Sequence, residues 1–87
     1  MERDLALKLF AIYKLQNEYK RNIYPDELRT HGICTRSQIK PLIDDLKVHY
    51  DIEEENIQGA NTYRVTNIGI SHLQSYLDIK RELYETR

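Results

Sequence analysis

The stretch RTHGICTRSQIKPLIDDLKVHY, residues 29–50, predicts a tight turn followed by a short amphipathic helix. Gly32 is expected to end the preceding helix, because a residue without Cβ enters the left-handed region at no steric cost. Thr35 and Gln38 have the spacing of a capping box, in which each side chain accepts from the other residue's N–H. Beyond them, apolar residues recur at helical spacing and predict a helix with one side against a core. They are Ile39, Leu42, Ile43 and Leu46.

The start of this predicted helix is cationic. Between Leu28 and Ile43 no residue is acidic, while Arg29, Arg36 and Lys40 are basic. A cationic helix with a polar tip after a tight turn is typical of the helix that a helix-turn-helix inserts into the major groove of DNA. Arg36 and Lys40 are suited to guanine, where each good pair gives ~1–3 kcal/mol of discrimination. The alternative is a solvated face, which is what most surface charges form.

Composition predicts one small globular domain, residues 1–87, with 31% charged and 40% hydrophobic residues. A net charge of −1 argues against indiscriminate coating of nucleic acid, so any binding must come from a local patch. We expect no membrane association and a cytoplasmic location, because no apolar run approaches the ~20 residues of a membrane span and a signal peptide is not recognisable. The single cysteine, Cys34, excludes an internal disulfide and suggests a small buried hydrophobe rather than a bridge between subunits.

The first helix is predicted at about residues 3–20 and is apolar on nearly all sides. Between Leu5 and Tyr13 only Lys8 is polar. A helix of this kind is buried on more than one side, either as an enclosed core helix or by a second subunit. The subunit contact is the favoured interpretation. It predicts a homodimer interface that includes Leu7, Phe10 and Ala11.

A helix-turn-helix is predicted at about residues 25–48. Pro25 starts its first helix, where the missing N–H costs nothing. Ile23 and Tyr24 precede it and can add a brief strand, because a residue before proline is pushed out of the α region. Pro41 lies inside the second helix of the pair, so that helix should kink or begin later.

Residues 51–66 predict a β-hairpin, with a turn signal at residues 58–61. Its first half carries a run of glutamates at 53–55, which is most simply a solvated edge that discourages strand pairing. The last helix is predicted at about residues 67–85, and its two apolar stripes exceed the usual ~100° arc of a surface helix. One stripe therefore needs a partner outside its own domain. The interface residues expected from this helix are Tyr76, Ile79 and Leu83.

Catalytic or metal chemistry is not expected. His31 and Cys34 have a spacing seen in metal sites, but a structural zinc needs four ligands, and a helix-end imidazole beside a packed thiol is the favoured interpretation. No nucleophile–base pairing, phosphate-binding glycine loop or paired carboxylates occur. The sequence therefore predicts neither an enzyme nor a cofactor.

The order of these elements resembles the winged helix-turn-helix superfamily, particularly small dimeric regulators of the MarR and PadR kind. It is also similar to small winged-helix proteins of phages, plasmids and archaeal viruses. The likeness is carried by the helix at 35–46, the YRVT at 63–66 and the GISHLQSYL at 69–77. The match to the way a wing runs into the last helix lies in Tyr63, Val65, Thr66 and Gly69. The resemblance implies an α+β, mainly helical fold of order α-(β)-α-α-β-β-α with a long C-terminal helix.

The resemblance further implies binding of double-stranded DNA. The third helix would read base edges, the start of the second would touch phosphate, and the hairpin would follow the neighbouring groove. The residues at matching positions are Arg36, Ser37, Gln38 and Lys40 for the major groove, Arg29 and Thr35 for phosphate, and Asn61 and Arg64 for the hairpin. The sequence departs from many wings in its glutamates at 53–55, and Asp44 lies on the outward side of the third helix. Both features repel phosphate, so helix insertion is expected to be shallow.

The function expected from the resemblance is a homodimeric transcriptional regulator. A dimer would present two such helices ~34 Å apart, about one turn of DNA. The alternative is a winged-helix protein-interaction module that presents its acidic hairpin to a basic partner and does not bind DNA. The residues do not indicate a small-molecule effector.

Overall fold

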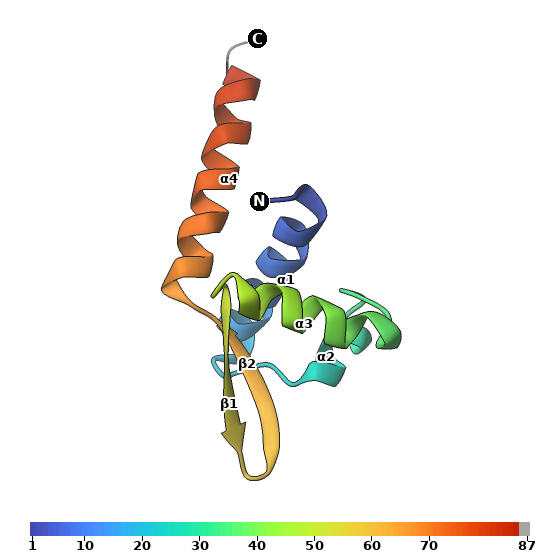
Figure 1. The fold of residues 1–87 in the computed structure, drawn as a ribbon. Coiled ribbons are helices and arrows are strands. Elements are labelled where there is room, and N and C mark those ends of the chain that lie inside the picture. Colours follow the sequence, from blue (N-terminus) through green and yellow to red (C-terminus); the bar gives the residue numbers. More distant parts are fainter. Residues whose placement is uncertain (86–87) are drawn as a thin grey trace.

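In the computed structural model the chain adopts an α+β, mainly helical fold with one two-stranded antiparallel sheet (Figure 1). The structure describes the backbone of residues 1–85 and the side chains of residues 1–76. The elements are α1 (Arg3–Tyr19), α2 (Pro25–Thr30), a short 3₁₀ helix η1 (Arg36–Gln38), α3 (Ile39–Val48), β1 (Ile52–Ile57), β2 (Ala60–Val65) and α4 (Asn67–Glu85). The coarse fold class predicted from the sequence is therefore confirmed.

Helix α1 supplies one side of the hydrophobic core. It buries Leu9 completely, and Ala6 and Ile12 are nearly as enclosed. The other core side chains are Leu15, Ile23, Leu28, Leu42, Ile43, Leu46, Ile52, Val65 and Leu73. Full burial of one such aliphatic side chain contributes ~1.5–3 kcal/mol, so α1 is expected to anchor the remaining elements. The helix ends at Tyr19, where Lys20 takes a left-handed conformation with φ +55°.

The link into α2 is held by a cluster of polar contacts. Arg21 donates two hydrogen bonds to the Glu27 carboxylate, at 2.8 and 2.9 Å. The same carboxylate accepts from the Tyr24 N–H at 2.9 Å, which satisfies one of the backbone donors at the start of α2. The backbone N–H of Ile23 donates to the Tyr63 carbonyl at 2.8 Å, and the Tyr63 N–H donates back to the Ile23 carbonyl at 2.9 Å. This bridge gives the hairpin a one-residue third strand.

The turn between α2 and α3 contains the left-handed residue that was expected, Gly32 at φ +70°. The predicted capping box is present, with Gln38 Oε1 accepting from the Thr35 N–H at 3.1 Å. The third helix was predicted to follow Thr35 and, because of Pro41, to kink or begin later, and it does begin later. The chain makes the 3₁₀ helix η1 first, and the α-helix begins at Ile39. Pro41 is thus the third residue of α3, where its missing N–H has no acceptor within the helix.

The hairpin pairs Ile52 with Val65 at its base and Ile57 with Ala60 at its tip. Gln58 and Gly59 connect the strands with φ +52° and +85°, the two positive values that a tight two-residue hairpin turn requires. Beyond β2, the Thr66 hydroxyl accepts from the Gly69 N–H at 3.0 Å and caps the first turn of α4. Helix α4 then runs past the N-terminal end of α1 (Figure 1).

Candidate nucleic-acid interface

The polar residues at the start of the third helix are exposed together. The side chains of Arg36, Ser37, Gln38 and Lys40 all face solvent. The Thr35 hydroxyl lies 3.3 Å from that of Ser37, and the capping box fixes the backbone on which these side chains stand. Among the described side chains, neither Arg36 nor Lys40 makes an ion pair. This tip therefore keeps two positive charges that no described carboxylate holds in an ion pair.

Arg29, predicted to touch phosphate, already has a partner in α2. Its guanidinium donates to the Asp26 carboxylate at 2.9 and 3.1 Å. The pair raises the pKa of Arg29, and it lowers the pKa of Asp26 with a smaller contribution from Arg36. Both partners are well exposed, so water and salt screen the pair and it exchanges readily. In the free protein Arg29 is offset by its neighbour and adds little to the cationic tip.

The predicted hairpin contacts are likewise engaged within the chain. Arg64 donates to the Glu53 carboxylate on the facing strand. Asn61 accepts from the Asn56 side chain at 3.0 Å, and Asn56 in turn accepts from the Gly59 N–H at 3.1 Å. These side chains brace the hairpin and its turn. In the free protein the side chains of Asn61 and Arg64 are thus engaged within the hairpin itself.

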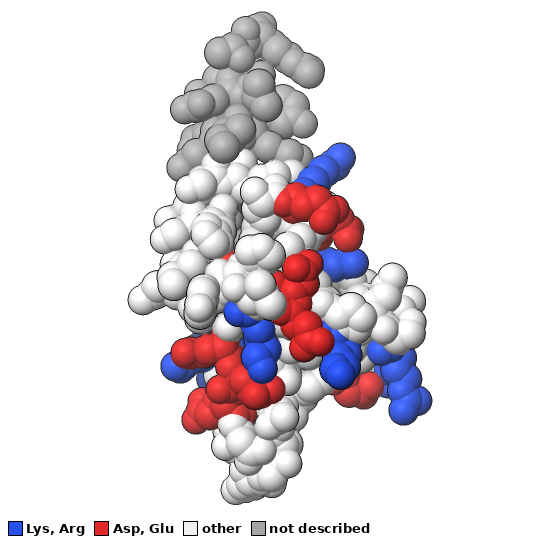
Figure 2. All heavy atoms as spheres, in the orientation of Figure 1, with Lys and Arg blue, Asp and Glu red and all other residues white. Residues whose placement is uncertain are grey.

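The other two glutamates of the hairpin also have partners. Glu54 accepts from the Tyr63 hydroxyl at 2.6 Å and lies 3.5 Å from Lys47, while Glu55 accepts from Asn22 at 3.0 Å. Figure 2 shows acidic and basic side chains side by side over this part of the molecule. Burial and the hydrogen bond to Glu54 raise the pKa of Tyr63 to about 12. The acidic strand is therefore largely compensated by its own chain.

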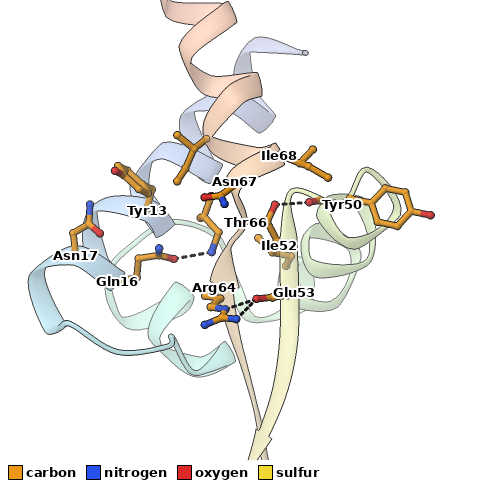
Figure 3. A pocket seen from close by; sticks show the side chains of 12 residues that line it. Tyr13, Gln16, Asn17, Tyr50, Ile52, Glu53, Arg64, Thr66, Asn67 and Ile68 are labelled. Atoms are coloured by element: carbon orange, nitrogen blue, oxygen red, sulfur yellow. Dashed lines mark hydrogen bonds and ion pairs between the residues drawn. The ribbon is translucent and has the colours of Figure 1, made fainter.

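A pocket of about 800 Å³ lies between α1, the base of the hairpin and the start of α4 (Figure 3). The polar groups in its wall bond to one another: Gln16 accepts from the Val65 N–H at 2.7 Å, and the Thr66 hydroxyl donates to the Tyr50 carbonyl at 2.6 Å. The Arg64–Glu53 pair forms its lower edge. These contacts hold the hairpin against both helices, and sequence reasoning did not anticipate the pocket.

A buried polar pair was also missed. Asp51 is fully buried between α3 and β1, and His72 of α4 lies against it. A second pocket, of about 470 Å³, opens beside them and is also lined by His49 and Asp45. The sequence signal for Asp51 was weak, since a lone acid after a helix is usually a turn residue. Within the described residues no group of three His, Cys, Asp or Glu side chains is placed to hold a metal ion.

His31 and Cys34 make different contacts in the structure. His31 Nε2 lies 2.8 Å from the Tyr19 hydroxyl, at the contact between α1 and α2. Cys34 is partly buried against the core, and this burial raises the pKa of its thiol. A raised pKa leaves less thiolate at neutral pH, which suits a packed side chain rather than a reactive one.

The residues predicted for the dimer interface fall into three groups. Leu7 and Phe10 are exposed, by 52% and 38%, and Ala11 beside them is half-buried. Tyr76 is partly buried against the core of its own chain. Ile79 and Leu83 lie outside the described side chains. An apolar surface on α1 is thus the part of the predicted interface that the structure displays.

Comparison with known proteins gives no further guide. No protein family, no curated protein and no solved structure matches this chain significantly. In the described part of the chain, no helix combines the length and the apolar character needed to cross a membrane.

Proposed function

We propose that this chain is a winged helix-turn-helix protein that binds double-stranded DNA sequence-specifically and regulates transcription as a homodimer. The observation that carries the proposal is the tip of the third helix. Arg36 and Lys40 stand exposed there, make no ion pair with any side chain that the structure describes, and lie beside the exposed side chains of Ser37 and Gln38. Guanidinium, ammonium, hydroxyl and carboxamide groups are the groups that read base edges in the major groove.

The order of elements supports the same proposal. A single bridge at Ile23 precedes α2, the tight turn leads into α3, and the hairpin returns directly into α4. This arrangement matches the α-(β)-α-α-β-β-α order of winged-helix proteins. It leaves the start of α3 on the outside of the molecule, with the apolar side of α3 on the core.

The charge pairs described above suggest how such a protein would contact DNA. In the free protein the cations of the hairpin and of α2 are each held by a carboxylate, as in Arg64 with Glu53 and Arg29 with Asp26. The first attraction for phosphate therefore comes from Arg36 and Lys40. Asp44, exposed one turn further along α3, keeps the later part of the helix away from phosphate. The proposed contact is a shallow insertion of the helix tip.

A second copy would strengthen this contact. Two cations on a domain of net charge −1 neutralise few phosphates, and each neutralised phosphate releases counterions that drive binding. A dimer doubles that number and places two tips on one face of the duplex. The exposed Leu7 and Phe10 on α1 support a self-association of this kind.

The proposal is tested by replacing Arg36 and Lys40 together with alanine. We expect the double variant to lose binding to duplex DNA and to unfold at the same urea concentration as the wild type, since both side chains are exposed. The matched control is Arg3→Ala with Lys20→Gln, which removes the same charge elsewhere. Fluorescence anisotropy at two salt concentrations should show a steep salt dependence for the wild type and the control.

Retained affinity in the Arg36→Ala, Lys40→Ala variant would exclude the tip of the third helix as the reading element. A wild-type protein that ignores DNA at low salt would instead favour the protein-interaction module. That alternative relies on an acidic hairpin, and each hairpin glutamate already has a partner on its own chain.

A further inference from the structure

We propose that the outward face of α1 packs antiparallel against the same face of a second copy, so that Asp4 of each chain lies opposite Lys14 of the other. The inference rests on the proposed homodimer and specifies its geometry. It starts from a row of residues that the fold leaves uncovered. Asp4, Leu7 and Lys14 are exposed, and Ala11 is half-buried.

These four residues form one stripe along α1. Their spacing is three, four and three residues, which is the pattern of the seam between two packed helices. Phe10 lies beside the stripe and is also exposed. The opposite side of α1 is the one that enters the core of the domain. The stripe is thus a second packing surface on a helix that already uses its first.

The order of residues along the stripe distinguishes between the possible arrangements. Asp4 and Lys14 stand five positions to either side of residue 9, and Leu7 and Ala11 stand two positions to either side. An antiparallel pair centred there sets Asp4 against Lys14 at both ends. A parallel pair would set Asp4 against Asp4 and Lys14 against Lys14. Like charges opposed in this way are destabilising, so the stripe is self-complementary only when antiparallel.

The apolar middle of the stripe fits the same arrangement. The pairing sets the large Leu7 against the small Ala11, twice by symmetry, which lets two helices approach to the usual 8–10 Å. The charged residues at the two ends make only weak surface interactions within their own chain. Asp4 lies 3.0 Å from Lys8, and the Lys14 ammonium lies over the Phe10 ring at 5.7 Å from its centre. Both attachments are at the surface and exchange readily.

One helix pair buries less surface than the ~1,200–2,000 Å² of a standard interface, so the charges at its ends should have a measurable effect on dimerisation. We therefore propose charge reversal as the test. Asp4→Lys opposes two lysines at each end, and Lys14→Asp opposes two aspartates. Each single variant is expected to raise the dissociation constant of the dimer about tenfold or more, as measured by sedimentation equilibrium, because symmetry applies the repulsion twice.

Restoration of the dimer is the decisive arm of the test. The double variant Asp4→Lys, Lys14→Asp regains opposite charges at both ends and should dimerise like the wild type. An equimolar mixture of the two single variants should form a heterodimer. The matched controls are Asp45→Lys and Lys20→Asp, which make the same charge changes away from the stripe and should leave the mass unchanged. Circular dichroism of every variant checks folding, since Asp4 lies in the first turn of α1 where a negative charge is favourable.

A monomeric wild type, single variants that stay as dimeric as the wild type, or a folded double variant that stays monomeric would each overturn the inference. DNA binding by the wild type, measured separately, keeps the two proposals apart. Salt-sensitive DNA binding combined with charge variants that stay dimeric rejects the α1 interface alone. The expected charge-reversal pattern in a protein that ignores DNA supports the interface and rejects the proposed function.

Discussion

The carboxylate of Asp51 is fully buried, and its Oδ1 atom lies 2.5 Å from Nδ1 of His72. The main chain of Asp51 is fixed as well, since its carbonyl accepts from the Thr66 N–H at 2.9 Å. Its other carboxylate oxygen is buried without a hydrogen bond within the described part of the chain. A buried carboxylate is costly unless it is paired. His72 thus secures α4 to the link between α3 and the hairpin.

Loss of this contact should destabilise the domain. We expect His72→Ala to lower the free energy of unfolding by about 1–3 kcal/mol, because Asp51 would remain buried without its side-chain partner. His49→Ala is the control, since His49 is exposed and its ring lies at the surface beside Asp45, 2.8 Å from the Asp45 carbonyl and 3.8 Å from its carboxylate. Urea unfolding followed by circular dichroism measures both. Equal stability of the two variants would show that the pair does not hold α4.

For Gly69→Ala we expect a change in stability opposite in sign to the one that helix propensity predicts. Gly→Ala within a helix ordinarily stabilises by roughly 1 kcal/mol. At Gly69, however, an added Cβ would lie 2.3 Å from the Asp51 carbonyl oxygen and 2.9 Å from a methyl group of Val65. Backbone must move to admit it, so we expect Gly69→Ala to destabilise by about 1–3 kcal/mol, the usual cost of overpacking. An increased melting temperature for this variant would contradict the close approach of α4 to Asp51.

Releasing Arg64 should strengthen DNA binding. Glu53→Gln removes a negative charge from the hairpin and frees the Arg64 guanidinium that Glu53 holds. We expect roughly a two- to fivefold tighter complex at low salt and a steeper salt dependence, because one more cation is available to neutralise phosphate. Glu18→Gln removes the same charge from the exposed surface of α1 and serves as the control. An equal increase in DNA affinity in both variants would show that the effect comes from net charge alone.

We expect ionisation of Tyr63 to lower the free energy of unfolding at alkaline pH. Its pKa is raised to about 12 from 10.0, by burial and by the hydrogen bond to Glu54. The folded state therefore holds this proton when the unfolded state has released it, and stability falls as pH rises from the unfolded value toward the folded one. We expect Tyr63→Phe to remove part of this alkaline slope in urea unfolding at a series of pH values. An unchanged slope would show that the alkaline loss of stability comes from a group other than Tyr63.

Much of the fold follows from local rules that the sequence displays. Pro25 and Gly32 mark where α2 begins and the turn that follows it, and Thr35 with Gln38 forms the cap before α3. These assignments succeed because the relevant energies depend on residues within one turn of each other. The later start of α3 is local as well. Pro41 has no N–H to donate to the carbonyl one turn back, so a regular α-helix from Thr35 is disfavoured and the chain begins with the 3₁₀ helix η1.

The residues of the candidate site could be proposed from the sequence, but their charge pairs could be foreseen only in part. Arg36 and Lys40 were proposed from an acid-free segment; the structure exposes both, and their contact with DNA stays a prediction. The pairing of Arg29 with Asp26 follows the three-residue spacing of a helix and was within reach of the sequence. The pairing of Arg64 with Glu53 depends on the strand register, which sets these residues opposite each other. A hydrophobic pattern of period two does not specify that register when the strand is largely polar.

The sequence by itself determined the helices, the hairpin and the apolar faces, because helix periodicity, turn chemistry and capping act between near neighbours in the chain. Only the tertiary structure decided which charges remain available and which groups are buried. Asp51 meets His72 across twenty-one positions of sequence, and Glu53 meets Arg64 across eleven. Contacts of this kind form when packing brings distant segments together. The free energy of such a contact depends on how far its groups are buried and how they are oriented in space, and neither can be read from the order of residues.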